Sequence, residues 1–200
     1  MTVKRVTDVI IALVALLLLW PLLLAGAALV WLSLGRPVFL VQMRPGLGGV
    51  PFGLLKLRTM REACDENGAP LPDAERLGRC GRFLRASSID EIPQLWNVLR
   101  GDMSLVGPRP LMMEYLPLYS PRQMRRHEVK PGLTGWAQIN GRNSLDWDSR
   151  LERDVWYVEN RGFAMDLTIL ARTVLCVLAR RGIVQSGSAT MDRFRGTSSV

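Results

Sequence analysis

The stretch Arg85–Pro110 reads RASSIDEIPQLWNVLRGDMSLVGPRP and places two adjacent carboxylates, Asp90 and Glu91, where a helix is expected to begin. The first turn of a helix has unpaired N–H groups and a partial positive charge, and both suit a phosphate group. Carboxylates at such a place stay ionised and can serve as nucleophile, base or metal ligand. We therefore expect this stretch to form a helical segment that carries chemistry on phosphate.

The same stretch predicts where its helix begins and ends. A helix is expected over 88–99, with Gly101 ending it. The tetrapeptide SIDE, which ends at Glu91, also has the form of a capping box, and this is the purely structural alternative for that glutamate. Further along, Arg109 stands between two prolines that restrict its position, so it suits a fixed phosphate clamp. A surface turn is the alternative for this arginine.

The composition narrows the choice of chemistry. The 200 residues carry a formal net charge of +8, which predicts an anionic partner: nucleic acid, an anionic bilayer surface or a phosphorylated substrate. Cys64, Cys80 and Cys176 lie far apart and match no disulfide or zinc pattern, which favours a reducing cytosolic environment. His127 is the single histidine and is expected at the surface, so a Ser-His-Asp triad and a multi-histidine metal site are nearly excluded.

The N-terminal part predicts a membrane segment. From Val9 to Leu34 the chain carries no formally charged residue. As a straight helix this run would span roughly 39 Å, enough to cross a bilayer core of about 30 Å. Pro21 stands in the middle of the run and predicts a kink, and basic residues flank the run on both sides. These two features favour a kinked, re-entrant hairpin that enters and leaves by one leaflet. An ordinary transmembrane helix with a tolerated proline is the alternative.

The chain beyond this run predicts one small α+β domain that is mainly α. Strands 37–43 and 51–60 are expected to pair as a hairpin, with Lys56 and Arg58 on one face of the second strand. The fold class is thus an N-terminal re-entrant helix hairpin plus one small cytosolic domain with a short β-hairpin and amphipathic interfacial helices. The expected boundaries are 1–36 for the membrane helix, 37–183 for the catalytic domain and 184–200 for a packed or mobile tail.

Helices and one structured loop complete this domain. Helices are expected over 73–84, capped by Asp73, and over 147–162, and a short helical, basic region over 116–128. A last helix, capped by Asp166 and ending at residue 181, is expected to lie in the membrane interface or to pack on the domain. The loop 130–143 offers polar groups that can converge on a site: Gln138, Asn140 and Arg142.

With these motifs in hand, the chain resembles the small monotopic phosphoglycosyl transferases, the bacterial sugar transferase family typified by PglC. The resemblance extends over nearly all 200 residues. It is carried by KRVTD (4–8), KLRTM (56–60), SIDEIPQLWNVLRGDMSLVGPRP (88–110), KPGLTGWAQINGRN (130–143) and ATMDRFRG (189–196). One departure concerns the membrane break, which in this family is usually Ser-Pro and here is Trp20-Pro21.

The resemblance implies an enzyme that moves a sugar-1-phosphate from a UDP-sugar to polyprenol (undecaprenyl) phosphate with release of UMP, the first membrane step of glycoconjugate synthesis. It implies Asp90 as the nucleophile of a covalent phospho-sugar intermediate and Glu91 as its partner in holding Mg²⁺. The candidate substrate-binding residues are Lys56, Arg58, Arg85, Arg109, Gln138 and Arg142. An N-acetylated donor such as UDP-di-N-acetylbacillosamine is expected, ahead of UDP-GalNAc and UDP-GlcNAc.

The resemblance also implies a place in the cell. The enzyme is expected at the bacterial inner membrane, monotopic, with its catalytic domain on the cytoplasmic face and in contact with anionic lipids. The oligomeric state is left open, a homodimer included.

Two other classes of function use the same features. A membrane-tethered protein that binds nucleic acid or anionic lipid would use the positive charge, including the arginines at 76, 79, 82 and 85, but needs neither the Asp90–Glu91 pair nor Mg²⁺. A nucleotide-sugar phosphohydrolase would use the same residues and pass the intermediate to water. The full-length resemblance favours transfer and no nucleic-acid partner.

Overall fold

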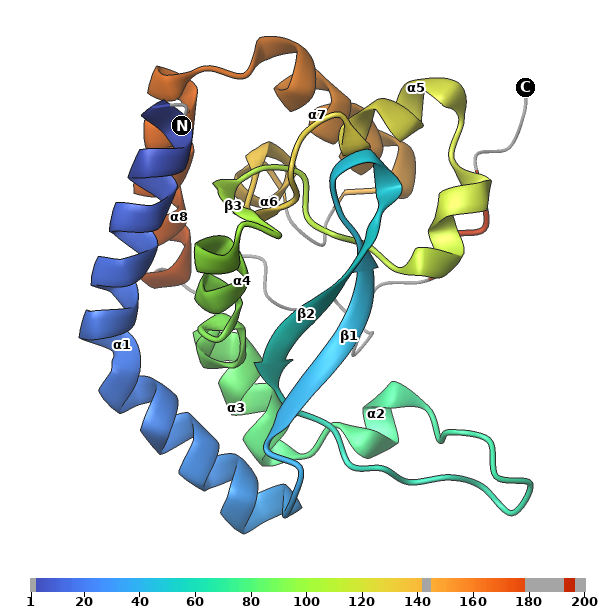
Figure 1. The fold of residues 1–200 in the computed structure, drawn as a ribbon. Helices are drawn as coiled ribbons and strands as arrows, with labels where there is room; N and C mark the ends of the chain where they lie inside the picture. The colour runs from blue at the N-terminus through green and yellow to red at the C-terminus, as the bar shows by residue number, and fades with distance from the viewer. Residues whose placement is uncertain (1–2, 142–144, 179–192, 197–200) are drawn as a thin grey trace.

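The computed structural model describes residues 3–141, 145–178 and 193–196. A long N-terminal helix, α1 (Val3–Leu34), runs along one side of a mainly helical body (Figure 1). A two-stranded hairpin of β1 (Phe39–Pro45) and β2 (Pro51–Leu57) crosses the front of that body in the same view. The predicted mainly α fold with a short β-hairpin is confirmed at this level.

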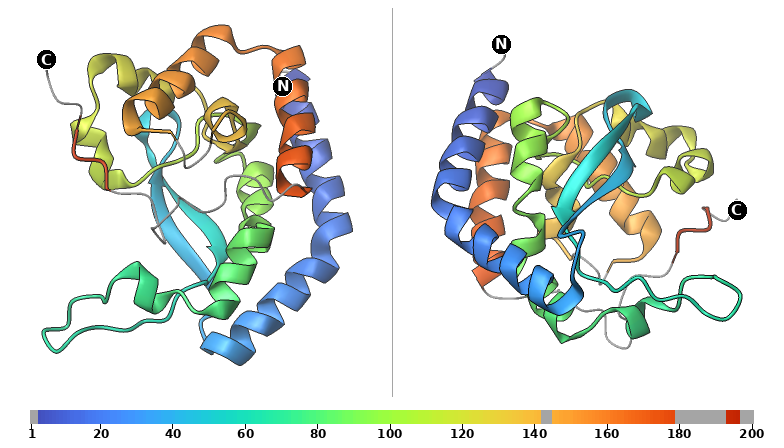
Figure 2. Two further views of the ribbon diagram at one scale, coloured as in Figure 1. Left: turned by 180° about the vertical axis from the view of Figure 1, so that it is seen from behind. Right: turned by 60° about the horizontal axis from the view of Figure 1, so that its bottom comes forward.

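Helix α1 is continuous and contains Pro21 in its interior. It changes direction part-way along its length (Figures 1 and 2). A proline has no N–H to donate and its ring clashes with the preceding turn, which accounts for such a bend. Within the described ranges this is the helix that is long and apolar enough to cross a membrane. The two arms predicted from the sequence are thus halves of one bent helix, and how it sits in a bilayer stays a prediction.

Both ends of α1 are bonded to the same body. Near its N-terminal end, Asp8 accepts a hydrogen bond from the Ser104 hydroxyl (2.8 Å) and Lys4 forms an ion pair with Asp166 (2.5 Å). At the other end, the Arg58 guanidinium donates to the carbonyl of the last helical residue (2.5 Å) and to the carbonyl that follows it (2.8 Å). The helix is therefore held at both ends by the elements that form the rest of the protein.

The register of the hairpin decides which cations share a face. The strands are antiparallel and pair Leu40 with Lys56 and Arg44 with Phe52. Side chains opposite one another in such a pair lie on the same face, and so do those two residues apart along a strand. Arg44 and Lys56 therefore lie on one face of the hairpin, four positions apart along it.

The central helical segment is divided differently from the prediction. The helix expected over 73–84 is two helices, α2 (Asp73–Arg76) and α3 (Arg79–Ser87), because the two residues between them have extended backbone. Asp73 lies in the first turn of α2, and no side chain caps that helix. The prediction of one capped helix here is wrong, since Gly78 interrupts it.

The helix expected over 88–99 also begins later than predicted. Ser88 has a left-handed backbone (φ 56°), Ile89–Glu91 form a 3₁₀ turn (η2), and the helix proper is α4 (Gln94–Arg100). The serine makes no side-chain capping bond, so the capping-box alternative is contradicted. Gly101 ends α4 in the left-handed conformation (φ 94°), as predicted.

Helix α4 covers the outer edge of β2. The side-chain amide of Asn97, which is 1% exposed, accepts from the N–H of Leu55 (3.0 Å) and donates to the carbonyl of Gly53 (2.7 Å). These are the bonds that a neighbouring strand would make. They hold the strand that carries Lys56 against the segment that carries Asp90.

The C-terminal half contains a second, parallel sheet that the sequence analysis did not predict. Its strands, β3 and β4, are three residues long and lie in segments rich in glycine and proline, which give no strand pattern. The bounds of the elements in this half are β3 (Ser104–Val106), η3 (Met113–Leu118), α5 (Pro121–Met124), η4 (Arg125–His127), β4 (Gly132–Thr134), α6 (Trp136–Ile139), α7 (Trp147–Asn160) and α8 (Phe163–Leu178).

Helices α1 and α8 lie side by side in Figures 1 and 2. The largest apolar core fills the space between these helices, α4 and the hairpin, and includes Ala12, Leu95, Val98 and Ile169. The helix predicted over 147–162 is α7, and its buried face includes Leu151, Val155 and Val158.

Two further expectations for this half are corrected. Asp166 lies inside α8 and not at its cap, because its carboxylate accepts a hydrogen bond from Tyr157 (2.7 Å) and pairs with Lys4. His127 is buried (6% exposed), and burial lowers its pKa to about 4, so it is neutral at physiological pH. The predicted end of the last helix at residue 181 lies outside the described residues. Of the tail 184–200 only 193–196 are described, and Phe194 there is buried.

Candidate active site

Asp90 is a buried acid in the 3₁₀ turn between α3 and α4, with 6% of its surface exposed. Burial raises its pKa to about 7, and the negative charge of Glu91 acts in the same direction. Lys56, Arg85 and Arg109 oppose this rise, in that order of effect. The structure therefore brings the predicted nucleophile together with three of the predicted substrate-binding cations.

Arg109 and Glu91 form a forked ion pair. Both terminal nitrogens of the guanidinium donate to the carboxylate: Nη1 to Oε2 at 3.4 Å, and Nη2 to Oε1. The charge of Glu91 is the main reason that the pKa of Arg109 is raised. This ion pair joins the turn that contains Asp90 to the segment 108–110, in which prolines flank Arg109 and which is called the clamp below. In the sequence, α4 and β3 separate the two segments.

Lys56 and Arg85 complete the cationic surroundings of the acid. Burial lowers the pKa of Lys56 to about 8, with a further contribution from the positive charge of Arg85, while Asp90 opposes the change. Arg85 donates from Nε to the hydroxyl of Thr59 (3.1 Å), and burial lowers its pKa as well. Cations that are partly desolvated interact with an anion more strongly than exposed ones. The arrangement suits a substrate with several phosphate charges.

Three predicted site residues do not join this cluster. Arg58 turns away from it, because its guanidinium binds the carbonyls at the end of α1; its role in the structure is to cap that helix. Gln138 donates to the carbonyl of Leu133 (3.1 Å), and its buried Oε1 has no hydrogen-bond partner among the described residues. Arg142 lies outside the described residues.

Arg44 is a site residue that the sequence analysis missed. Its pKa is lowered by burial first and by the charge of Arg109 second, which places it in the same cationic cluster. Its charge also lowers the pKa of Lys56. The signal in the sequence was the hairpin register, which puts residues 44 and 56 on one face once the turn is known.

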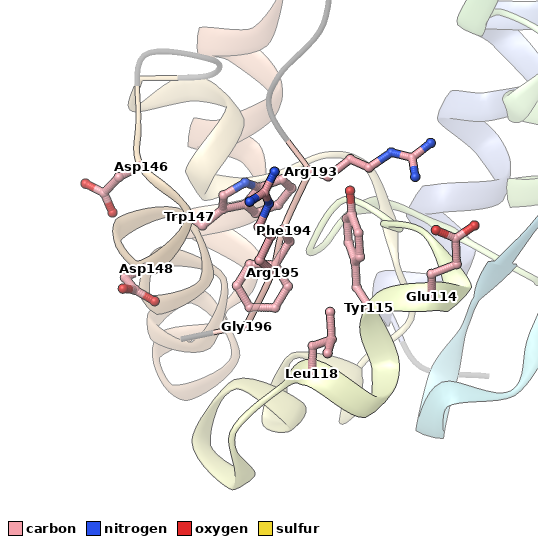
Figure 3. A pocket seen from close by; sticks show the side chains of 10 residues that line it. All are labelled: Glu114, Tyr115, Leu118, Asp146, Trp147, Asp148, Arg193, Phe194, Arg195 and Gly196. Atoms are coloured by element: carbon pink, nitrogen blue, oxygen red, sulfur yellow. The ribbon is translucent and has the colours of Figure 1, made fainter. Parts of the chain in front are cut away.

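A cavity of about 920 Å³ lies between η3, the first turn of α7 and the segment 193–196 (Figure 3). Tyr115, Trp147 and Phe194 lie close together in it, with ring centroids 5.3 to 5.7 Å apart. Its other lining residues are Glu114, Leu118, Asp146, Asp148, Arg193, Arg195 and Gly196. Two charges connect it electrostatically with the acid cluster: Arg150, which stacks on Trp147 (5.3 Å) and feels the charge of Arg109, and Glu114, whose charge acts on Arg44. A volume of this size falls in the range of small-molecule sites.

Comparison with known proteins decides the family. Residues 1–180 match the family described as bacterial sugar transferase. The chain belongs to this family. The predicted resemblance is thus confirmed.

Three relatives of this bacterial sugar transferase illustrate the match. EpsL of Bacillus subtilis (strain 168), an uncharacterized sugar transferase, is 54% identical over 200 residues, which are 100% of this chain and 99% of the relative. A UDP-glucose:undecaprenyl-phosphate glucose-1-phosphate transferase of Caulobacter vibrioides is 44% identical and is covered to 69% of its length. An enzyme of the same name from Xanthomonas campestris pv. campestris is 41% identical over 89% of this chain, but only 39% of its own length is covered.

The donor atoms around Asp90 fit Mg²⁺. The ion prefers hard oxygen ligands and usually binds through one or two carboxylates plus substrate phosphates. Asp90 and Glu91 supply two adjacent carboxylates, and the described residues contain no group of three or more His, Cys, Asp or Glu that could hold a metal alone. The site therefore fits an ion whose remaining ligands come from phosphate oxygens and water. Glu91 is the residue that would hold it.

Proposed function

We propose that this chain transfers a sugar-1-phosphate from a UDP-sugar to polyprenol phosphate, releasing UMP, through a covalent intermediate on Asp90. The observation that carries the proposal is the buried carboxylate of Asp90 among Lys56, Arg85 and Arg109. An acid with this environment, in a chain with a long apolar helix, matches a reaction between a soluble nucleotide and a lipid phosphate. Relatives whose names contain undecaprenyl phosphate, among them those of Caulobacter vibrioides and Xanthomonas campestris, support the same reaction.

In the first step, a carboxylate oxygen of Asp90 attacks the phosphorus that bears the sugar. The bond from this phosphorus to the bridging oxygen breaks, and UMP leaves with the electron pair of that bond. In the second step, a phosphate oxygen of the polyprenol phosphate attacks the same phosphorus and the bond to Asp90 breaks, which restores the carboxylate and forms a lipid diphosphate sugar. No net proton transfer is needed in either step.

The charges around the acid explain how two anions can meet. Asp90 must approach a diphosphate that repels it, and Lys56, Arg85 and Arg109 offset that repulsion and the charge that develops on UMP. Mg²⁺, when bound by Glu91 and phosphate oxygens, would supply further positive charge to the diphosphate. The cavity lined by Tyr115 and Trp147 is the proposed place for the rest of the donor, because Arg193 and Arg195 in its lining offer positive charge to the diphosphate.

The test is UMP release by the full-length protein in lipid nanodiscs with undecaprenyl phosphate and Mg²⁺. The panel of donors contains UDP-glucose, UDP-galactose, UDP-GlcNAc, UDP-GalNAc and UDP-di-N-acetylbacillosamine. We expect UMP from one or a few donors and a lipid-linked phospho-sugar in equal amount, with an N-acetylated donor as the preferred one. UMP release that is equally fast without the lipid acceptor would assign a phosphohydrolase instead. Relatives named for glucose and for N-acetylgalactosamine make both kinds of donor necessary in the panel.

We also propose that α1 enters and leaves the membrane by the cytoplasmic leaflet. Asp8 and Lys4 bind the body at one end of α1, and Arg58 binds its other end. A straight crossing would have to place these two anchored ends on opposite sides of a bilayer core of about 30 Å. Different elements of one body bind the two ends, so a bent helix with both ends on one side is the favoured arrangement.

Cysteine labelling tests this arrangement. In an otherwise cysteine-free chain, Val3→Cys and Arg36→Cys introduce thiols at exposed positions on the two sides of the apolar run. We expect an impermeant maleimide to label neither variant in intact cells and to label both in inside-out vesicles. Labelling of one variant alone in intact cells would mean that α1 crosses the membrane.

A further inference from the structure

Arg126 is a buried arginine outside the acid cluster, in η4, and its contacts lead to the main chain of the clamp. Its side chain is 1% exposed and pairs with Asp154 of α7 (Nη2 to Oδ2 2.7 Å, Nε to the same oxygen 3.2 Å). Nη1 donates to the hydroxyl of Tyr119 (3.3 Å), and Nη2 also donates to the carbonyl of Arg109 (2.7 Å). Every terminal nitrogen of the guanidinium thus has an acceptor.

The carbonyl of Arg109 belongs to a segment that has few other means of being held. The prolines on either side of it have no N–H group, so they cannot donate to a neighbouring strand. The carbonyl of Pro108 accepts from the N–H of Gly132 (3.0 Å), and the next carbonyl, that of Arg109, accepts from Arg126. Hydrogen bonds from Gly132 and from Arg126 therefore hold the carbonyls of Pro108 and Arg109. The side chain of Arg109, which leaves the main chain between these two carbonyls, bonds to Glu91.

We propose that Arg126 is a positioning residue: it holds the main chain of Arg109 so that the Arg109 guanidinium stays on Glu91 beside Asp90. The inference rests on the proposed function, because it assigns Arg109 a part in the transfer. The hydrogen bonds of Arg126 go to Asp154, Tyr119 and the carbonyl of Arg109, so the inferred action on the site runs through Arg109.

The burial of the pair favours this role over one in stability alone. Removing two charges from water is costly, and replacing a buried ion pair by apolar residues of similar size is often neutral or stabilising. Asp154 is 3% exposed, and burial raises its pKa against the effect of Arg126. Unlike a methionine at position 126, the arginine donates a directed hydrogen bond to the carbonyl of Arg109.

The test is a double-mutant cycle on turnover in nanodiscs. One change is the paired replacement Arg126→Met with Asp154→Leu, which leaves no unpaired buried charge. The other is Arg109→Ala. We expect the paired replacement to lower kcat roughly 10- to 100-fold when Arg109 is present, with less change in KM, and less than about twofold when Arg109 is absent. An equal loss of kcat in both backgrounds would overturn the inference, because the pair would then act without Arg109.

Arg122→Met is the matched control. Arg122 also pairs with a glutamate of α7, Glu152, but at the surface and without contact to the clamp. We expect it to leave kcat within about twofold of the unchanged protein. If this control lowers turnover as much as the paired replacement does, the effect belongs to the docking of α7 and the inference fails.

A second readout does not depend on turnover and separates this inference from the proposed function. Glu91→Gln weakens the ion pair with Arg109 and should change the thermal midpoint of the intact chain. We expect that change to be absent in the Arg126→Met, Asp154→Leu background, where Arg109 is no longer held on Glu91. If the paired variant does not fold, Arg126→Lys replaces it in this measurement, because lysine keeps the positive charge beside Asp154 but lacks the forked guanidinium. An unchanged effect of Glu91→Gln in these backgrounds would refute the positioning role, even if the protein transfers no sugar in any assay.

Discussion

Replacing Asp90 with asparagine will lower UMP release at least about 10,000-fold, the order of loss seen when a covalent nucleophile is removed. The amide has nearly the shape of the carboxylate but cannot attack phosphorus to form the acyl phosphate. With donor labelled in the sugar phosphate and no acceptor present, the unchanged protein will retain label on the chain and the variant will not. Because only the ionised acid attacks, labelling of the unchanged protein will slow as the pH falls below about 7, the raised pKa of Asp90.

Asp102→Asn is the control for this prediction. Asp102 is the first carboxylate after the Asp90–Glu91 pair, and its side chain contacts Asn97 and Arg100. We expect it to retain label like the unchanged protein. Label that persists in Asp90→Asn would remove Asp90 as the nucleophile and would leave the covalent scheme without its central residue.

Replacing Glu91 with glutamine will lower kcat roughly 100- to 1,000-fold and will raise the Mg²⁺ concentration needed for half-maximal rate. Two effects contribute, because the same side chain is the proposed metal ligand and the partner of Arg109. A neutral amide binds a hard divalent cation more weakly than a carboxylate does. The measurement is UMP release over a range of Mg²⁺ concentrations, with a chelator series for the unchanged protein.

Glu128→Gln is the matched control for Glu91→Gln, since Glu128 pairs with Arg125 on the surface. It should have the Mg²⁺ dependence of the unchanged protein. A Glu91→Gln variant that loses rate but keeps the original Mg²⁺ dependence would restrict this residue to holding Arg109. Activity of the unchanged protein that survives removal of divalent cations would exclude the metal altogether.

In the candidate site, patterns among neighbouring residues predict some features correctly and others incorrectly. The adjacency of Asp90 and Glu91 and the stiffness of the segment around Arg109 follow from the chain itself, and the structure has both. The pairing of Glu91 with Arg109 does not follow, because the local pattern offered a capping box that the left-handed Ser88 prevents. Arg58 was placed with Lys56 by strand alternation, which describes a face but not the direction of a long flexible side chain.

Residues far apart in the sequence were the hardest to assign. His127 is expected at the surface, since the chain has no second histidine with which it could bind a metal, yet it is buried and packs on Tyr119. Arg44 joins the acid cluster only through the hairpin register and the approach of Arg109. Arg126 carried no signal at all, since its partners Asp154 and Arg109 come from two other segments.

By itself the sequence determined the apolar run with its proline, the hairpin, the end of α4 at Gly101 and the pair of acids. Each of these depends on residues within a few positions of one another, where propensity, periodicity and turn chemistry act. Only the tertiary structure decided which cations face Asp90, that Arg58 caps α1 and that both ends of α1 are held by one body. Electrostatic and packing energies depend on distance in space, so they are fixed when distant segments meet and not before.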